Sequence, residues 1–306
     1  HSNCSKPTGI GLTLCLLPNT GQRIADTKCE EYRNLTIRTT GILPLVARPN
    51  PIKVASFTCT KTVKLIVGGE VAKKNEFPHQ ALLGWIERNP RRNVFSCGGS
   101  LISRRYVLTA AHCFKVRDAD FVRLGEHDLN ENSGNHKDFD IASITRHPDY
   151  RFSSSYHDIA LIKLNENVRF SKVIRPACLW TKHDINVNAV IATGYGLMET
   201  GGNHSTVLRK VVLKFLDRDI CGMQFSGRSF RSGLIDEQLC IGSDTSARDT
   251  CQGDSGGPIQ TLLGGCTYHI IAVTSLGPGS CGLAPALYTR VSSYVDWIES
   301  IVWEYE

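Results

Sequence analysis

Three residues that lie far apart in the chain have side chains suited to activating a nucleophile. Ser255 lies in the glycine-rich run GDSGGP at residues 253–258, His112 lies in TAAHC at 109–113, and Asp158 lies in HDIAL at 157–161. A serine hydroxyl is a weak nucleophile until a neighbouring base removes its proton, and a third group has to orient that base. The sequence therefore predicts that the fold brings these three side chains together.

Short apolar segments separated by turn-forming residues fill the part of the chain that contains these motifs. From residue 66 onward the pattern is typical of antiparallel strands in a barrel or sandwich. Near the end, Val295, Ile298 and Val302 share one helical face, and Ser293 with Asp296 looks like a capping pair, so we expect a short helix over residues 293–302. The clearest expected strands are 80–86, 100–109, 159–164, 189–192 and 270–275.

The first 65 residues differ from the rest in charge and composition. They carry nine Lys and Arg against three Asp and Glu, whereas residues 66–306 carry 26 of each, so the net charge of +6 lies entirely in this leader. Proline-bearing stretches at 42–44 and 48–51 favour an extended linker. The charge fits a solvated leader or a contact with an acidic partner surface, and nothing indicates nucleic-acid binding. We expect two units, a leader over 1–65 and a folded domain over 66–306.

The cysteines and the lack of a long apolar run indicate a secreted, extracellular protein with no membrane partner. Twelve cysteines, an even number without metal-finger spacing, are typical of disulfides formed in an oxidising compartment. No apolar run approaches the roughly 18 residues of a membrane span. Because the chain begins at His1, we expect an export signal to have been removed. Asn3, Asn34 and Asn203 lie in glycosylation sequons, which agrees with secretion.

In the motifs around His112, Asp158 and Ser255, and in their order along the chain, the sequence resembles the chymotrypsin/trypsin family of secreted serine peptidases. The resemblance covers residues 66–306 and implies an all-β fold of two six-stranded antiparallel barrels with the active site between them. It also implies that His112 acts as general base and then general acid, and that Asp158 orients its imidazole. The backbone N–H groups of Gly253 and Ser255 would form the oxyanion hole.

The resemblance extends to the trigger of activity. Ile66 begins the run IVGG, which is similar to the amino terminus that zymogen cleavage creates in this family. The freed ammonium would pair with Asp254 beside the nucleophile, because a buried carboxylate without a partner is unfavourable. The residue before the cut is Leu65. A trypsin-like enzyme does not readily cut there, so we expect an activating protease of chymotrypsin-like preference.

The resemblance also implies a specificity pocket. Asp249 matches the carboxylate at its base and implies cleavage after Lys or Arg, the alternative being a surface aspartate in a turn. Ser275, Gly277 and Ala286 match other pocket positions. Ala286 stands where the family usually has glycine. Because one added methyl group in a tight pocket is worth about 1–3 kcal/mol, we expect a lower Arg-to-Lys preference than in an ordinary trypsin.

Disulfide pairs follow from the same resemblance. The leader is similar, at residues 28–32, to the regulatory leader of snake-like clip-domain proteases of arthropods, although it has too few cysteines for the six of a complete clip module. Cys178 matches the position that tethers such a leader. The expected pairs are Cys97–Cys113, Cys221–Cys240, Cys251–Cys281 and the tether Cys59–Cys178. The four remaining cysteines are assigned by parity as Cys4–Cys15 and Cys29–Cys266, although spacing alone does not fix connectivity.

One acidic loop resembles the family's calcium loop. Glu126, Asp128, Glu131 and Asp138 offer the hard oxygen ligands that suit Ca²⁺, while a solvated acidic hairpin accounts for the same residues equally well. The expected chemistry requires no cofactor.

The family resemblance implies the secreted zymogen of a trypsin-like endopeptidase in an extracellular cascade such as innate immunity, melanisation, Toll-type signalling or clotting. Its partners would be an upstream activating protease, a protein substrate that is a downstream zymogen or ligand precursor, and serpin-type inhibitors. A digestive or venom serine protease is one alternative, which a short untethered leader would favour. A non-catalytic protease homologue acting as a cofactor is the other, and the intact His112, Asp158 and Ser255 count against it.

Overall fold

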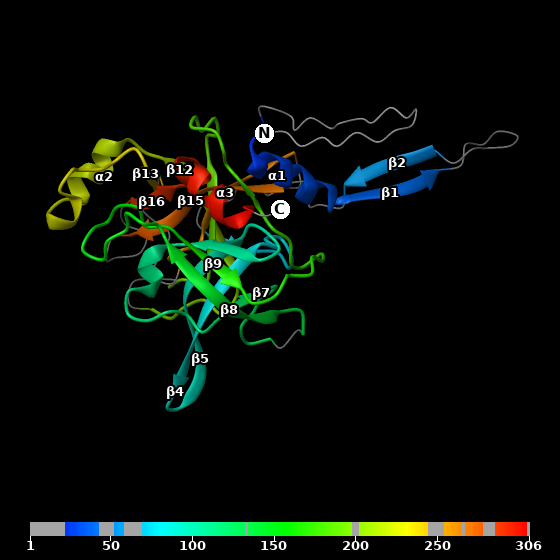
Figure 1. The fold of residues 1–306 in the computed structure, drawn as a ribbon, viewed down its shortest axis with the longest axis horizontal. Helices are drawn as coiled ribbons and strands as arrows, with labels where there is room; N and C mark the ends of the chain where they lie inside the picture. The colour runs from blue at the N-terminus through cyan, green and yellow to red at the C-terminus, as the bar shows by residue number, and fades with distance from the viewer. Residues whose placement is uncertain are drawn as a thin grey trace, which may run out of the picture.

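Two closed β-barrels lie side by side in the computed structural model and confirm the expected fold (Figure 1). The structure describes residues 22–42, 52–57, 69–131, 134–197, 202–243, 254–264, 267–277 and 285–304.

The first barrel is a six-stranded antiparallel ring around an apolar core. The expected strand over 100–109 is divided, because residues 102–105 form a turn between two antiparallel strands. In order around the ring, the strands are β4 (Gln80–Arg88), β5 (Arg91–Leu101), β6 (Tyr106–Thr109), β9 (Ala160–Leu164), β8 (Lys137–Arg146) and β7 (Phe121–Leu124).

The second barrel is closed by the pairing of β15 with β16, and its ladders are antiparallel. Two short strands extend it: β10 (Cys178–Leu179) pairs in parallel with β15, and β3 (Glu70–Val71) pairs with β12. The ring consists of β15 (Thr267–Leu276), β14 (Pro258–Leu263), β11 (Val190–Gly194), β12 (Arg209–Phe215), β13 (Gln238–Gly242) and β16 (Ala286–Arg290).

Short helices lie between the strands and after the last of them. The expected C-terminal helix is α3 (Val295–Val302), and Val295, Ile298 and Val302 are buried as predicted. The predicted capping pair is wrong, because Ser293 lies inside the preceding 3₁₀ turn and Tyr294 is the N-cap residue. The others are the 3₁₀ helices η1 (Ala111–Phe114), η2 (Arg228–Phe230) and η3 (Val291–Tyr294), and the α-helix α2 (Arg218–Gln224).

The leader contains ordered elements that the sequence did not predict. Helix α1 (Ile24–Asn34) lies beside α3, and a separate two-stranded antiparallel sheet of β1 (Ile37–Ile42) and β2 (Ile52–Phe57) extends away from the barrels (Figure 1). Ala25 of α1 joins the main apolar core, and the Tyr32 ring meets Phe170 edge-on with their centroids 6.0 Å apart. The leader is therefore packed on the folded domain through one face of α1.

The tether between leader and folded domain differs from the expected one. Cys178 is bonded to Cys29 of α1, with their Cα atoms 5.0 Å apart, so both Cys59–Cys178 and Cys29–Cys266 are wrong. The physical reason is that Cys29 lies between Ala25 and Tyr32 on the face that α1 presents to β10. Cys59 and Cys266 lie outside the described residues, as does the pair Cys4–Cys15.

This pairing makes a direct prediction about the cleaved protein. If the chain is cut after Leu65, we expect the two pieces to remain joined on a non-reducing gel and to separate on a reducing gel. A Cys59→Ser variant should keep the link, because the Cys29–Cys178 bond does not involve Cys59. Release of the leader from Cys59→Ser without reductant would contradict the Cys29–Cys178 tether.

Candidate active site

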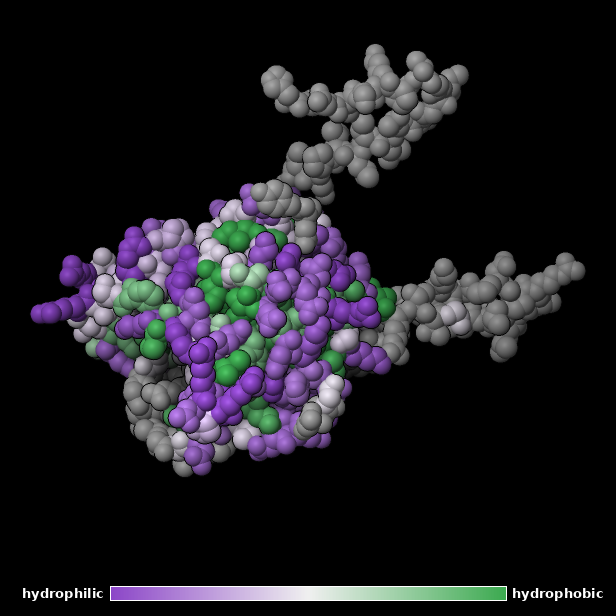
Figure 2. Space-filling view, turned by 60° about the horizontal axis from the view of Figure 1, so that its bottom comes forward, coloured by the Kyte–Doolittle hydropathy of each residue, from purple (hydrophilic) through white to green (hydrophobic). Residues whose placement is uncertain are grey.

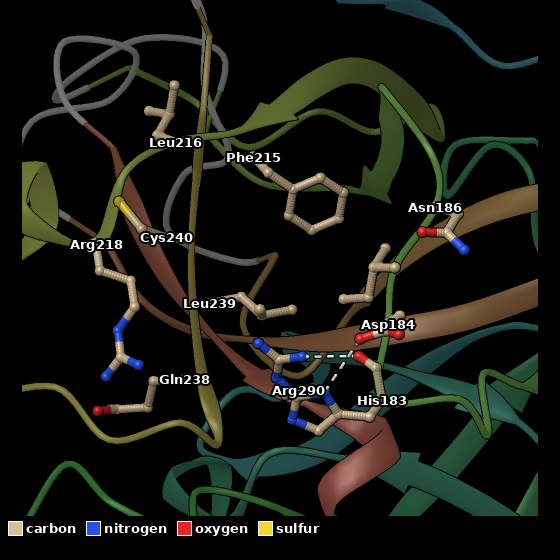
Figure 3. Close-up of a pocket in the computed structure, with 11 residues that line it drawn as sticks. His183, Asp184, Asn186, Phe215, Leu216, Arg218, Gln238, Leu239, Cys240 and Arg290 are labelled. Atoms are coloured by element: carbon tan, nitrogen blue, oxygen red, sulfur yellow. Dashed lines mark hydrogen bonds and ion pairs between the residues drawn. The ribbon is translucent and has the colours of Figure 1, made fainter.

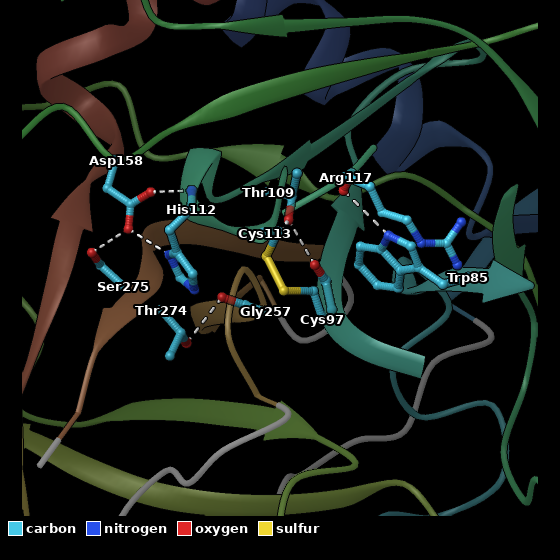
Figure 4. The surroundings of a disulfide bond; sticks show 11 residues. Trp85, Cys97, Thr109, His112, Cys113, Arg117, Asp158, Gly257, Thr274 and Ser275 are labelled. Atoms are coloured by element: carbon cyan, nitrogen blue, oxygen red, sulfur yellow. Dashed lines mark hydrogen bonds and ion pairs between the residues drawn. A yellow bond between two sulfur atoms is a disulfide. The ribbon is translucent and has the colours of Figure 1, made fainter. Parts of the chain in front are cut away.

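The pairing of β6 with β9 brings His112 and Asp158 together. His112 lies on η1 just after β6, and Asp158 lies just before β9; the two strands pair with Thr109 opposite Ala160. The backbone N–H of His112 donates to Asp158 Oδ1 over 2.8 Å, and His112 Nδ1 lies 2.7 Å from Asp158 Oδ2 (Figure 4). These two bonds fix the carboxylate and the imidazole in one relative orientation.

Two hydroxyl groups from the second barrel hold Asp158 in place. Ser275 Oγ donates to Asp158 Oδ2 over 2.5 Å, and Thr289 Oγ1 donates to the Asp158 carbonyl over 2.9 Å. Ser275 was predicted only as a pocket residue, and sequence reasoning missed its bond to Asp158. Thr289 was missed altogether, because a threonine inside a strand carries no local signal of such a contact.

The electrostatics of the pair suit proton transfer at His112. Asp158 is only 3% exposed. Burial acts to raise its pKa, but the charge of His112 and the hydrogen bonds from His112 and Ser275 outweigh burial and lower the pKa. Burial in turn acts to lower the pKa of His112, and the Asp158 carboxylate outweighs this and raises it. The arrangement stabilises an imidazolium beside a carboxylate, which is the charge distribution a general base acquires.

The turn that carries Ser255 packs onto the segment that leads into His112. The Gly98 N–H donates to the Ser255 carbonyl over 2.7 Å. Gly256 has a φ of +75°, and a Cβ there would come within 2.2 Å of Thr109 Oγ1, so this turn requires glycine. The close approach brings Ser255, just before β14 of the second barrel, next to the His112 segment of the first.

Asp254 lies against two glycines that sequence reasoning missed. The Gly196 N–H donates to Asp254 Oδ1 over 2.9 Å. A Cβ on Gly194 would come within 1.9 Å of Asp254 Oδ1, and a Cβ on Gly196 within 2.5 Å of Oδ2. The sequence TGYG at residues 193–196 was the available signal. The lack of side chains at Gly194 and Gly196 thus leaves room for the Asp254 carboxylate beside the Ser255 turn.

Two predicted disulfides are present. Cys97–Cys113 joins β5 to η1 directly beside His112 (Figure 4), and Cys221–Cys240 joins α2 to β13. The first therefore anchors the turn that carries the candidate base. Cys251–Cys281 lies outside the described residues.

Several predicted site residues can be placed only in part. Ala286 is fully buried on β16 opposite Ile241, and Gly277 is exposed. Asn34 and Asn203 are exposed, as glycosylation requires. Outside the described residues lie Asn3, Leu65, Ile66, Asp249 and Gly253.

Neighbouring side chains already contact the carboxylates of the acidic loop. The buried Glu126 accepts from Arg123 over 3.3 Å, and His136 Nδ1 lies 3.2 Å from the same carboxylate oxygen. Arg123 also donates from Nε to Asp138 over 2.7 Å. Asp128 accepts from the Asn130 N–H through its side chain. No three of the four predicted calcium carboxylates, all in the described part of the chain, have ligand atoms within 4.8 Å of one another, and Arg123 already binds Glu126 and Asp138.

We therefore expect calcium to have little effect on stability. Saturating a specific site about 100-fold above its Kd would contribute about 2.7 kcal/mol. For a domain of this size that is a rise in Tm of roughly 5–10 °C. We expect thermal unfolding in excess Ca²⁺ and in EDTA to agree within about 1 °C. A Tm that is several degrees higher in Ca²⁺ than in EDTA, and a difference that Glu126→Gln removes, would support calcium binding by this loop.

A separate hollow of about 470 Å³ lies on the second barrel (Figure 3). Phe215 and Leu239 are among its apolar lining residues, and Arg290 lines the side where it donates to the His183 carbonyl over 3.1 Å. Figure 2 shows exposed hydrophobic residues interspersed among hydrophilic ones on the face it draws. None of the helices that the structure describes is long and apolar enough to cross a membrane.

Comparisons with known proteins agree with this geometry. The chain is 39% identical to Serine protease snk of Drosophila melanogaster over 98% of this chain and 71% of that protein. It is 32% identical to CLIP domain-containing serine protease B4 of Anopheles gambiae over 94% of this chain and 83% of that protein. It is 34% identical to Clotting factor G beta subunit of Tachypleus tridentatus over 77% of this chain and 79% of that protein.

A solved structure and a family model extend the agreement. The structure of neuropsin, a serine protease of mouse brain, matches with a TM-score of 0.65 and 30% identity, covering 78% of this chain and all of that one. The trypsin family model matches residues 66–298, the part that contains His112, Asp158 and Ser255. On the fold, the site and this match, the chain belongs to the trypsin family of serine proteases.

Proposed function

We propose that this chain is the secreted zymogen of a trypsin-like endopeptidase that works in an extracellular proteolytic cascade. The observation that carries the proposal is the bonded arrangement of His112, Asp158 and Ser275 next to the Ser255 turn. In the proposed reaction, His112 takes the proton of Ser255 Oγ as that oxygen attacks the scissile carbonyl, and returns it to the leaving amine. The Ser255 N–H, with Gly253, stabilises the oxyanion.

Activation is proposed to occur between Leu65 and Ile66. The place that Gly194 and Gly196 leave for Asp254 supports this role, because it sets the carboxylate where a new ammonium could order the Ser255 turn. Because Leu65 precedes the proposed cut, the activating protease would have to cleave after apolar residues. The disulfide from Cys29 to Cys178 would keep the leader attached after the cut.

Relatives support the cascade role. One is named for a clip domain and another as a subunit of a clotting factor. We propose by analogy that the substrate is a downstream zymogen or ligand precursor, that serpin-type inhibitors stop the enzyme, and that it cleaves after Lys or Arg held by Asp249. The buried Ala286 would lower the preference for Arg over Lys.

Changing the activation residue tests this proposal. We expect trypsin to switch on a Leu65→Arg zymogen, whereas the wild type should respond to chymotrypsin-like or elastase-like enzymes and not to trypsin. The measurement is the rate of cleavage of a peptide library after each treatment, which also reports the Arg-to-Lys ratio. Efficient self-activation of the wild type, or activity without a cut before Ile66, would contradict the proposed trigger.

A further inference from the structure

Two histidine rings stack beside the segment that carries Asp158. The rings of His147 and His157 have centroids 5.3 Å apart and planes 20° from parallel, and His157 immediately precedes Asp158. The His147 N–H donates to the carbonyl of Ile159, the residue after Asp158, over 3.0 Å. His157 therefore precedes Asp158 in the chain, and His147 is hydrogen-bonded to Ile159, the residue that follows Asp158.

The backbone of His157 has an uncommon conformation. Its φ is +55°, in the left-handed region that residues with a Cβ seldom adopt. Such a conformation persists where the surroundings hold it. Here the His157 ring stacks on His147, and its Nδ1 lies 3.0 Å from the Tyr294 hydroxyl. The direction in which Asp158 leaves this residue thus depends on contacts of the His157 ring.

His147 lies in surroundings that favour its neutral form. Its side chain is 13% exposed, and Tyr294 and Trp297 contact its ring edge-on. The Asp149 N–H donates to His147 Nδ1 over 3.3 Å, a bond that requires an unprotonated Nδ1. Burial lowers the pKa of His147, and the charge of His157 lowers it further, against the Asp149 carboxylate 3.9 Å away.

The other ionisable groups around the pair do not supply a buried counter-charge for a proton on His147. Tyr294 stays neutral, because burial and the nearby carboxylates of Glu237, Asp158 and Asp149 raise its pKa. The Asp149 side chain is largely exposed, so water screens it. Asp158 is already bonded to His112. A proton on His147 would therefore lie in the stack with little compensation.

We propose that the stacked pair of His147 and His157 positions Asp158, and that protonation of His147 in mild acid moves Asp158 out of alignment with His112. Protonation of His147 at Nδ1 removes the acceptor of the Asp149 N–H and places a charge against the His157 ring, which opens the stack that holds the left-handed turn at His157. The consequence for rate rests on the proposed function, because the alignment of Asp158 affects catalysis only if the triad is catalytic.

The acid limb of the pH–rate profile tests this pair. Protonation of His112 alone lowers kcat/KM by about tenfold per pH unit below its pKa. With a second proton entering below pH 6.5, we expect the wild-type limb to steepen toward about a hundredfold per unit. His147→Phe keeps an aromatic ring but cannot be protonated, so its limb should stay near about tenfold per unit. Each variant is normalised to its own rate at pH 8.

A matched substitution controls for the change itself. His183→Phe replaces a histidine whose side chain is 80% exposed and should keep the steep wild-type limb. His147→Gln serves as a second uncharged variant if the phenylalanine disturbs folding. A wild-type limb that stays near about tenfold per unit down to pH 5, or a limb of equal steepness in wild type and both His147 variants, would overturn the proposal.

A second measurement does not depend on catalysis. In Ser255→Ala, NMR can follow the His112 Nδ1 proton that is bonded to Asp158 while the His147 ring titrates. We expect that signal to be lost together with protonation of His147, and to persist in the same acid range when His147→Phe is added. Loss of the signal in both would refute the positioning role. If the signal follows His147 but no form of the protein cleaves peptides, the proposed function fails and the positioning role stands.

Discussion

Ser255→Ala is expected to lower kcat/KM of the activated protein by roughly a million-fold while leaving the fold intact. The reason is that in the proposed reaction Ser255 supplies the attacking oxygen, and without it only the weaker nucleophile water remains. Because Ser255 and His112 act as a unit, the double variant Ser255→Ala/His112→Ala should lose at most about tenfold more than either single variant. Peptide hydrolysis after the cut at Leu65, together with thermal unfolding of each variant, measures both statements.

Ser143→Ala, which changes an exposed serine on β8, is the matched control and should retain activity. Covalent labelling by a serine-directed fluorophosphonate separates the alternatives. Labelling of the activated wild type and not of Ser255→Ala is expected. An activated wild type that is neither labelled nor active would favour the non-catalytic homologue, and full activity in Ser255→Ala would remove the triad assignment.

The barrel core was predictable because its signals are local. Most of the expected strands, such as 80–86 and 159–164, agree with β4 and β9 to within two residues at either end. Their alternating or continuous apolar patterns record burial directly. The prediction of a single strand over 100–109 was wrong, because the turn at 102–105 separates two apolar strands, β5 and β6. Short-range patterns therefore predict which residues are buried more reliably than they predict where the chain turns.

Helix α1 was not predictable, because its N-terminus is completed by a distant residue. Arg23, at the N-cap position, makes no side-chain capping bond. Instead the Ala25 N–H donates to Glu299 Oε1 over 3.0 Å, and Arg23 pairs with Asp296 and Glu299 of α3. A helix end needs partners for its free N–H groups, and here they come from the other end of the chain.

The same limit applies to the site. The motifs predict His112, Asp158 and Ser255 as the candidate site, because the identities of these residues carry the chemistry. The bond from Ser275 to Asp158 joins residues 117 apart in the sequence, and the tether from Cys29 to Cys178 joins residues 149 apart. Such contacts depend on how the two barrels and α1 pack, and cysteine spacing does not specify connectivity.

Gly194→Ala is expected to lower kcat/KM by at least about a hundredfold without preventing cleavage after Leu65. An added Cβ would come within 1.9 Å of Asp254 Oδ1 and 2.8 Å of its Cγ, so the carboxylate has to leave its place and its bond from the Gly196 N–H. Asp254 immediately precedes Ser255, whose N–H is a proposed oxyanion donor. Loss of one such donor lowers kcat by about 10²–10³-fold.

Gly222→Ala on α2 is the matched control for this substitution, because nothing lies within 4 Å of a Cβ added there. It should retain activity and gain up to about 1 kcal/mol of stability from the higher helix propensity of alanine. Thermal unfolding of both zymogens, the rate of their cleavage after Leu65, and kcat/KM of the products separate a folding defect from a misplaced carboxylate. A cleaved, folded Gly194→Ala enzyme with wild-type kcat/KM would show that the observed place of Asp254 is not the one that activity requires.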